Sequence, residues 1–258
     1  MAFSPRGVKY MSMTTSLNPK EIEHFSKYSS RWWDENGPFR PLHRLGSVRL
    51  RYLRDRITGH YGLDGDSLSP FTGMKILDVG CGGGLVCEPL ARLGGHVTGI
   101  DADENAIAVA KDHAAGMGLK INYLCGTAES LTKKKQQFDV VLALEIVEHV
   151  ADRDFFVRTC ADLCRPGGLV IFSTLNRTPK SFALGIVAAE HILRWVPRGT
   201  HDWRKFVKPS ELAAAARKAG LTEKNISGYG FNPLSGQFDL SDRHVAVNYF
   251  MTLGKGGT

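Results

Sequence analysis

The sequence lacks long apolar segments, a regular cysteine pattern and any dense cluster of one charge. No stretch approaches the roughly 18 apolar residues of a membrane-spanning helix, because the longest candidate, 181–196, is interrupted by Glu190, His191 and Arg194. The five cysteines are an odd number without repeated pair spacing. A zinc set or a disulfide framework is therefore not indicated, and we expect buried thiols in a reducing compartment.

The charge balance is basic but diffuse. Lysine and arginine total 33 against 26 acidic residues, a net charge of +7 that allows an anionic partner. The run 133–135 is only three lysines in a predicted surface loop, so a nucleic-acid partner is not indicated. Residues 1–17 contain no acid, and we predict a disordered leader there, with a weak organelle-targeting segment as the alternative.

The most informative stretch is 75–84, where a short apolar segment ends in four glycines within five positions. The apolar residues are typical of a buried parallel strand, and a helical pattern begins at Leu85. The glycines are Gly80, Gly82, Gly83 and Gly84. Without Cβ atoms they allow positive φ and a close approach of a ligand to the main chain. This pattern predicts the strand–turn–helix unit of a doubly wound α/β fold.

Two acids near this turn indicate the kind of ligand. Asp101 ends a second predicted strand, 96–100, about 20 residues after the first glycine, where a carboxylate can bind both ribose hydroxyls of a nucleoside. Asp78 lies within the first strand, and no cation occurs between Gly80 and Arg92. The turn therefore suits a ligand with a positive centre or an amino group better than a pyrophosphate.

An acid–acid–histidine set, Glu145, Glu148 and His149, follows the fourth predicted strand. If the chain turns helical there, the three side chains share one face. They could then hold Mg²⁺, Mn²⁺ or Zn²⁺. Alternatively, His149 is a general base that a glutamate orients. In the third interpretation the two glutamates only stabilise the positive N-terminal end of a helix, and His149 is a histidine packed in the protein interior.

Residues 76–84 resemble motif I of the class I S-adenosylmethionine-dependent methyltransferases. The resemblance implies a Rossmann-like sheet of seven strands, the last pair antiparallel, for which we expect 226–229 and 245–252. It also implies that the glycine turn, including Gly80 and Gly82, faces the methionine part of the cofactor and that Asp101 holds the ribose. The segment 123–129, with Ala128 and Glu129, would lie beside the adenine.

Several strings are similar to the ubiquinone-biosynthesis O-methyltransferases over about residues 18–252. They include Trp32-Trp33-Asp34, Leu144-Glu-Ile-Val-Glu-His-Val150 and Trp195-Val-Pro-Arg-Gly-Thr-His201. The resemblance implies that S-adenosylmethionine is bound by Arg49, Gly80, Asp101 and Leu144, and the position of Asp78 beside the turn adds it to the predicted cofactor-binding residues. Arg49 would meet the cofactor carboxylate, and Leu144 would act through its backbone. In some members the acid–acid–histidine set holds a divalent cation.

This family methylates aromatic hydroxyls of polyprenylated quinone precursors twice, on a catechol and on a demethylated ubiquinol. We therefore expect a lipid-embedded substrate, and other ubiquinone-pathway enzymes are possible partners. Residues 180–196 predict a helix with a broad apolar face and basic neighbours, typical of an anionic membrane surface. Burial of this helix on the domain core is the alternative. We expect a peripheral protein on the cytoplasmic face of a bacterial inner membrane, or otherwise on the mitochondrial matrix face.

The expected organisation has five parts. They are the leader 1–17, an N-terminal helical segment 18–72, a cofactor-binding core 73–175, a lid or membrane-interface insertion 176–207, and a C-terminal helix with closing strands 208–258. Two other functions stay open: methylation of another small phenol or acid, and a catalytically silent lipid-binding subunit of a biosynthetic complex. The intact glycine turn and Asp101 favour an enzyme.

Overall fold

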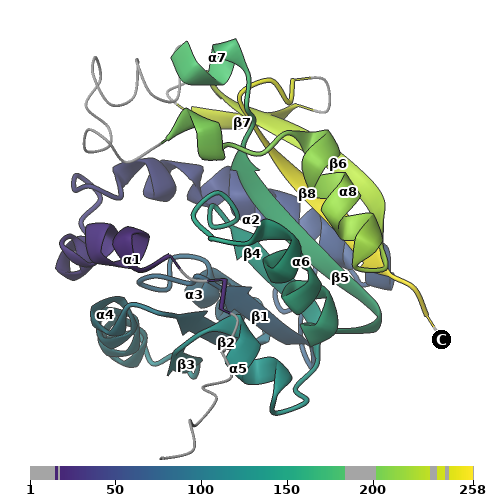
Figure 1. The fold of residues 1–258 in the computed structure, drawn as a ribbon. Coiled ribbons are helices and arrows are strands. Elements are labelled where there is room, and N and C mark those ends of the chain that lie inside the picture. The colour runs from purple at the N-terminus through teal and green to yellow at the C-terminus, as the bar shows by residue number, and fades with distance from the viewer. Residues whose placement is uncertain (1–14, 17, 184–201, 233–236, 242–243, 258) are drawn as a thin grey trace, which may run out of the picture.

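A single mixed sheet forms the centre of the computed structural model, which describes residues 15–16, 18–183, 202–232, 237–241 and 244–257. The strands run in the order β3-β2-β1-β4-β5-β8-β6-β7 (Figure 1). Strands β1 to β5 are parallel, and the last three pair antiparallel. Their bounds are β1 Lys75–Val79, β2 His96–Asp101, β3 Asn122–Cys125, β4 Phe138–Leu144, β5 Cys164–Leu175, β6 Leu221–Asn232, β7 Gln237–Ser241 and β8 Asn248–Lys255.

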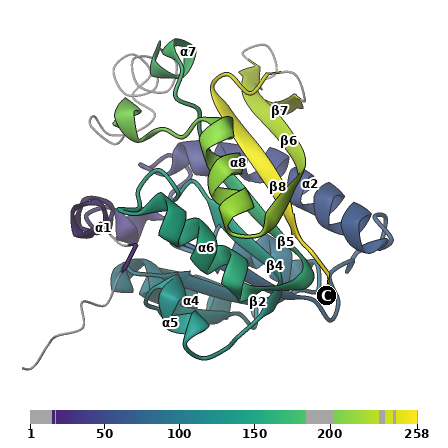
Figure 2. The same cartoon turned by 45° about the vertical axis from the view of Figure 1, so that its right-hand side comes forward.

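Helices cover both faces of this sheet, as Figure 2 shows. Helices α5, α6 and α8 pack on one face, and α2, α3 and α4 on the other. The described helices are α1 Pro19–Ser26, η1 Ser29–Arg31, α2 Arg40–Tyr61, α3 Cys87–Arg92, α4 Glu104–Gly116, α5 Ala128–Thr132, α6 Arg153–Leu163, α7 Pro179–Ser181, η3 Trp203–Lys205 and α8 Pro209–Lys218.

The continuous apolar character of the central strands follows from this sandwich. In β4, Val140 and Leu142 pack against the α2 side, whereas Val141 and Ala143 pack against the α6 side. Successive side chains point to opposite faces, so a strand buried on both faces needs apolar residues at every position. The doubly wound α/β fold expected from the sequence is therefore confirmed.

The sheet has one strand more than the seven expected. Strand β7 pairs with β6 from Gly228↔Ser241 to Asn232↔Gln237 and forms the edge of the sheet. Its five residues alternate polar and apolar around Phe238 and Leu240, and such a short pattern is a weak signal beside the prolines and glycines of neighbouring turns. The closing strands β6 and β8 also differ from the ranges expected for them.

Two other segments differ from expectation or lie beyond the description. Ser16, inside the expected leader, is buried, with its backbone N–H donating to Glu129 and its carbonyl accepting from Ala151. The predicted helix 180–196 lies mostly outside the described residues; its described start includes Phe182, which is 46% exposed. None of the helices within the described ranges has the length and apolarity to span a bilayer.

Candidate active site

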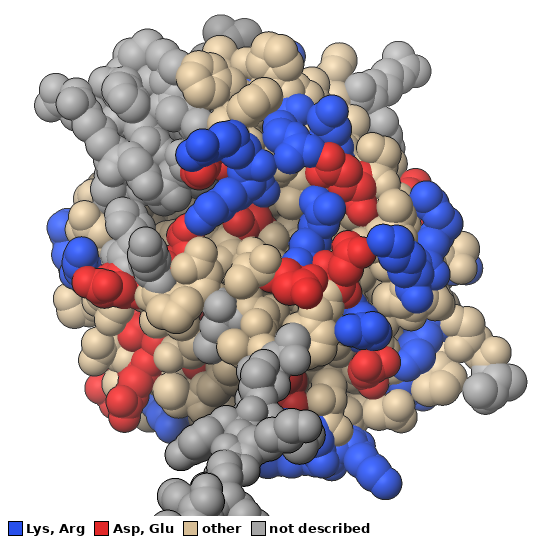
Figure 3. All heavy atoms as spheres, in the orientation of Figure 1, with Lys and Arg blue, Asp and Glu red and all other residues tan. Residues whose placement is uncertain are grey.

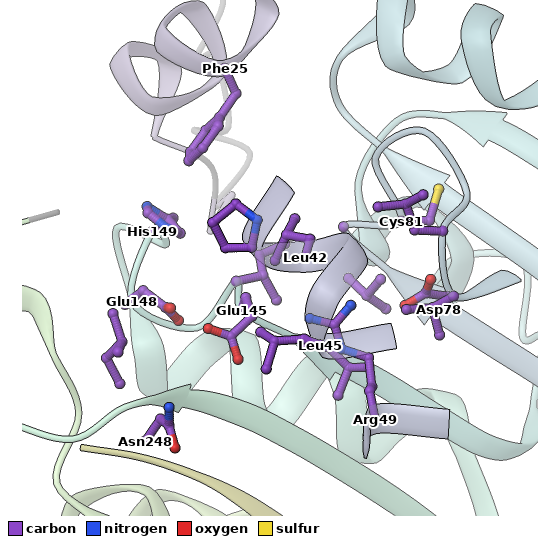
Figure 4. Close-up of a pocket in the computed structure, with 18 of the residues that line it drawn as sticks. Phe25, Leu42, Leu45, Arg49, Asp78, Cys81, Glu145, Glu148, His149 and Asn248 are labelled. Atoms are coloured by element: carbon purple, nitrogen blue, oxygen red, sulfur yellow. The ribbon is translucent and has the colours of Figure 1, made fainter. Parts of the chain in front are cut away.

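A cavity of about 850 Å³ opens at the carboxyl ends of the central parallel strands, where doubly wound folds bind ligands. One part is bounded by the turn after β1, the end of β2 and the start of α5. The other part lies between α2 and the β6–β7 hairpin. Figure 4 shows side chains from α1, α2 and the turn after β4 pointing into it. Lining residues include Arg49, Asp78, Gly80, Asp101, Ala128, Glu129, Leu144, Glu145, Glu148 and His149.

Of the four glycines in the turn after β1, Gly80 alone lines the cavity. Gly80 lines the cavity with φ +74, and a Cβ there would lie 2.3 Å from the side chain of Ile146. A Cβ on Gly82 or Gly83 would instead meet Trp32, at 2.3 and 2.4 Å. Gly84 makes room for the hydroxyl of Tyr123. Of the two glycines predicted to bind the cofactor, Gly80 lines the cavity and Gly82 does not.

We predict that Gly83→Ala destabilises the protein by about 1–3 kcal/mol, because Trp32 must leave its stack on Phe39 to admit a methyl group. The matched control is Gly116→Ala at the end of α4, where a Cβ meets nothing within 4 Å. That change should be neutral or stabilising. Thermal unfolding of both variants checks the prediction, and equal melting temperatures would contradict it.

Asp101 joins the end of β2 to the glycine turn. Its Oδ2 accepts from the N–H of Gly82 at 2.8 Å and its Oδ1 from the N–H of Asp103 at 2.9 Å. Burial raises the pKa of Asp101, and these backbone hydrogen bonds oppose that rise. Each carboxylate oxygen can accept more than one hydrogen bond, so this side chain is fixed in place yet able to bind ligand hydroxyls.

Asp78 and Arg49 place opposite charges in the cavity wall below the glycine turn. Asp78 is buried, which raises its pKa to about 7, while the charge of Arg49 acts in the opposite direction. Arg49, on α2, is 5% exposed, and its Nε has no hydrogen-bond partner among the residues that the structure describes. A buried guanidinium N–H without a partner is costly, so this position favours an anionic ligand group such as a carboxylate.

Glu129, at the start of α5, offers a buried acceptor. Its Oε1 accepts from the N–H of Ser16 at 2.8 Å, while Oε2 is buried and has no partner within the described ranges. Burial raises the pKa of Glu129, but the hydrogen bonds from Ser16 outweigh burial and hold it below its usual value. An ionised acceptor beside Ala128 suits a ligand amino group.

The turn after β4 is strained and is not helical, so the condition under which the acid–acid–histidine set would share one helix face is not met. Glu145 has φ +54, a left-handed conformation that is rare outside glycine. Its N–H donates to the carbonyl and to the hydroxyl of Ser173 on β5, which ties this residue to the sheet. Such strain persists where surrounding contacts hold it and is frequent at functional sites.

The acid–acid–histidine set therefore does not share one helix face. Glu145 accepts from the hydroxyls of Ser173 and Tyr229, both at 2.7 Å. Glu148 accepts from Thr174 at 2.9 Å, and burial raises its pKa. Within the described part of the chain, no three His, Cys, Asp or Glu side chains group as metal ligands do. The arrangement gives the cation interpretation no support.

His149 pairs with a residue that sequence reasoning missed. Its Nδ1 lies 3.0 Å from Oε2 of Glu21 on α1, and Oε1 of Glu21 lies 2.5 Å from Nζ of Lys205. Burial lowers the pKa of His149, but Glu21 and the other nearby carboxylates outweigh it and raise the value above 6.5. The same contacts lower the pKa of Glu21 to about 2. No local pattern could reveal a pair 128 residues apart.

Comparison with solved structures agrees with this architecture. The chain is similar to magnesium protoporphyrin IX methyltransferase from Synechocystis with bound SAH, with a TM-score of 0.60 at 15% identity over 91% of this chain and 95% of that one. It is also similar to a possible histamine N-methyltransferase from Thermotoga maritima, with a TM-score of 0.57 at 19% identity over 92% and 98%. The fold is that of the S-adenosylmethionine-dependent methyltransferases.

Sequence comparison defines the class and then the family. Residues 77–172 match the family described as a methyltransferase domain. The ubiquinone biosynthesis O-methyltransferase of Sinorhizobium medicae is 49% identical over 92% of this chain and 95% of its own. Those of Dinoroseobacter shibae and Maricaulis maris are each 50% identical, over 92% and 93% of this chain and 95% and 94% of their own. The chain belongs to the family of ubiquinone biosynthesis O-methyltransferases, which confirms the sequence interpretation as an O-methyltransferase.

Proposed function

We propose that the protein transfers a methyl group from S-adenosylmethionine to aromatic hydroxyls of polyprenylated intermediates, at both O-methylation steps of ubiquinone biosynthesis. One observation carries this proposal: the cavity that runs past Gly80 and Asp101 continues without a break to the β6–β7 hairpin. At about 850 Å³ it lies in the upper part of the ~300–1,000 Å³ range of small-molecule sites. Such a cavity suits a cofactor and an acceptor side by side.

The residues at the nucleotide end fit the cofactor. Arg49 would bind its carboxylate, and the backbone at Gly80 and Leu144 would border its methionine part. Asp101 would hold the ribose hydroxyls, with Glu129 accepting from the adenine amino group. This assignment agrees with the buried Nε of Arg49 and the buried Oε2 of Glu129, which lack partners among the described residues.

The acceptor end is apolar and aromatic, as a polyprenylated ring requires. Phe231 and Phe238 lie with their ring centroids 5.4 Å apart on the β6–β7 hairpin, and Leu42 and Leu45 of α2 border the same cavity. Tyr229 and Glu145 bring polar atoms to this region. An apolar wall with few polar groups is the usual design for orienting a hydrophobic ligand.

The chemistry needs positioning and removal of one proton. S-adenosylmethionine supplies a methyl group on a sulfonium, whose C–S bond breaks with the electron pair passing to sulfur. The aromatic oxygen forms the new bond to that carbon, and His149 accepts the proton of the hydroxyl. The protein holds the two reactants together in a fixed orientation.

The resemblance suggests a membrane contact and, in some members, a divalent cation. As arranged, Glu145, Glu148 and His149 do not form a cation site, so no step is routed through one. A peripheral position on the cytoplasmic face of a bacterial membrane, near anionic lipid and other pathway enzymes, agrees with an isoprenoid substrate. Figure 3 shows basic side chains on the face that carries α7, mixed with acidic ones.

We predict that thorough chelation leaves cofactor affinity unchanged, because none of the proposed cofactor contacts needs a cation. Calorimetric titration with S-adenosylmethionine before and after EDTA measures this affinity, and a loss of binding would contradict the assignment. Turnover assayed on the same samples tests the cation itself. Activity lost with EDTA and restored by Mg²⁺ would establish a cation role, and unchanged activity would exclude one.

The decisive experiment is methyl transfer to a polyprenyl catechol with and without liposomes of anionic lipid. We expect methylated product, with faster turnover when liposomes present the substrate. A catechol of the same ring pattern without the isoprenoid tail is the control. Equal kcat/KM for both acceptors would favour a small-phenol enzyme, and no product with either, despite stabilisation by S-adenosylmethionine, would favour a silent subunit.

A further inference from the structure

A three-residue chain of polar contacts joins α1, the turn after β4 and η3. Glu21 of α1 contacts Nδ1 of His149 through one carboxylate oxygen, at 3.0 Å, and Nζ of Lys205 through the other, at 2.5 Å. The side chains of Glu21 and His149 are only 19% and 15% exposed, and both residues line the cavity. This burial separates the pair from exposed ion pairs such as Asp154–Lys218, which contribute little.

We infer that Glu21 is a positioning residue that fixes the ring of His149 through Nδ1, so that Nε2 is the nitrogen available to the acceptor hydroxyl. This inference rests on the proposed role of His149. A carboxylate that accepts from Nδ1–H sets both the tautomer and the orientation of an imidazole. The neutral ring then carries its lone pair on Nε2, where it can take a proton.

The other groups around His149 do not compete for this role. Glu145 accepts from Ser173 and Tyr229, and Glu148 accepts from Thr174, so hydroxyls of β5 and β6 hold both carboxylates. The ring of Phe25 meets the imidazole edge-on, with centroids 5.1 Å apart, and restricts its rotation. Figure 4 shows Phe25 and His149 on the same side of the cavity, opposite Arg49 and Asp78.

Lys205 completes the arrangement by holding Glu21 in place. Its ammonium and the imidazole occupy different oxygens of the same carboxylate, so the carboxylate has little freedom to rotate away. Removal of Lys205 should therefore loosen Glu21 without touching the histidine. We therefore expect substitution of Lys205 to lower kcat less than substitution of Glu21 does.

Steady-state kinetics of Glu21→Ala, Glu21→Gln and Lys205→Met test the inference on the full chain with the polyprenyl catechol. We expect Glu21→Ala to lower kcat about tenfold to a hundredfold, as loss of a group that orients a functional histidine usually does. KM for S-adenosylmethionine should change less than twofold. Glu21→Gln should recover most of kcat, because its amide oxygen still accepts from Nδ1–H. Lys218→Met, which breaks an exposed pair, is the matched control.

The double variant Glu21→Ala/His149→Ala distinguishes positioning from a structural role. If Glu21 acts through His149, the double variant is no slower than His149→Ala alone. A further loss equal to that of Glu21→Ala would overturn the inference, as would wild-type kcat in both Glu21 variants. Wild-type activity in His149→Ala would instead overturn the proposed base. If Glu21→Ala does not fold, Glu21→Asp, whose side chain is one methylene shorter, carries the same comparison.

Discussion

Replacing Asp101 with alanine is expected to weaken S-adenosylmethionine binding by roughly a hundredfold or more. Two hydrogen bonds from ribose hydroxyls to an ionised carboxylate contribute about 3 kcal/mol together. The same substitution leaves the N–H groups of Gly82 and Asp103 without their acceptor. The glycine turn should therefore also loosen, which adds to the loss of affinity.

Isothermal titration of the purified variants measures this effect. Asp101→Asn keeps one acceptor oxygen and should fall between alanine and wild type. Asp112→Asn, on the exposed side of α4, removes an acid outside the cavity and is the control. Near-native affinity in Asp101→Ala, with its fold verified by circular dichroism, would exclude the ribose role.

The sequence predicted the core of the fold well because each parallel strand carries its own signal. A strand buried on both faces is expected to be apolar throughout, as Val140–Leu144 is, and in Ile76–Val79 only Asp78, which lines the cavity, departs from this pattern. The edge strand β7 has one buried side at most, and its signal is correspondingly weak. Strand β7 bears on the proposed function, because Phe238 and Leu240 line the part of the cavity proposed to hold the acceptor.

The candidate site was predictable where its residues lie at the carboxyl ends of the parallel strands. Gly80 and Glu145 directly follow β1 and β4, and Asp101 is the last residue of β2; the topology of the sheet brings these strand ends together. Gly82 shows the limit of this reasoning. A glycine in the sequence does not tell whether a ligand or a neighbouring side chain occupies the volume that a Cβ would fill, and at Gly82 that neighbour is Trp32. Glu21 shows another, because its partner is fixed only by how α1 packs over the cavity.

The pH range in which the Glu21–His149 pair most stabilises the fold differs from the range in which His149 can act as a base. The pKa of His149 is raised in the folded state, so its contribution to stability is fully present below 6.5 and is lost as pH rises through the folded value. The pKa of Glu21 is lowered from 4.5 to about 2, so its contribution is present above 4.5 and fades as pH falls toward 2. The pair therefore stabilises the fold most between about pH 4.5 and 6.5, where His149 is charged and unable to accept a proton.

Replacing His149 with alanine is accordingly expected to lower kcat by about 10²–10⁴-fold, the usual contribution of a general base. In the wild type, kcat/KM should rise with pH through the elevated pKa of His149, since only the neutral imidazole accepts the proton. The variant should lose this dependence. Its kcat/KM should rise only with the fraction of acceptor present as free phenolate, which increases as the pH approaches the pKa of the acceptor hydroxyl.

A pH series of initial rates for wild type, His149→Ala and the control His96→Ala, at an exposed position of β2, provides the measurement. If His149→Ala keeps the wild-type profile at reduced rate, the histidine supports structure and another group takes the proton. If the rate falls while affinity for S-adenosylmethionine is unchanged, the loss lies in the transfer step. The unchanged affinity is expected because Arg49, a proposed cofactor contact, lies across the cavity from the imidazole (Figure 4).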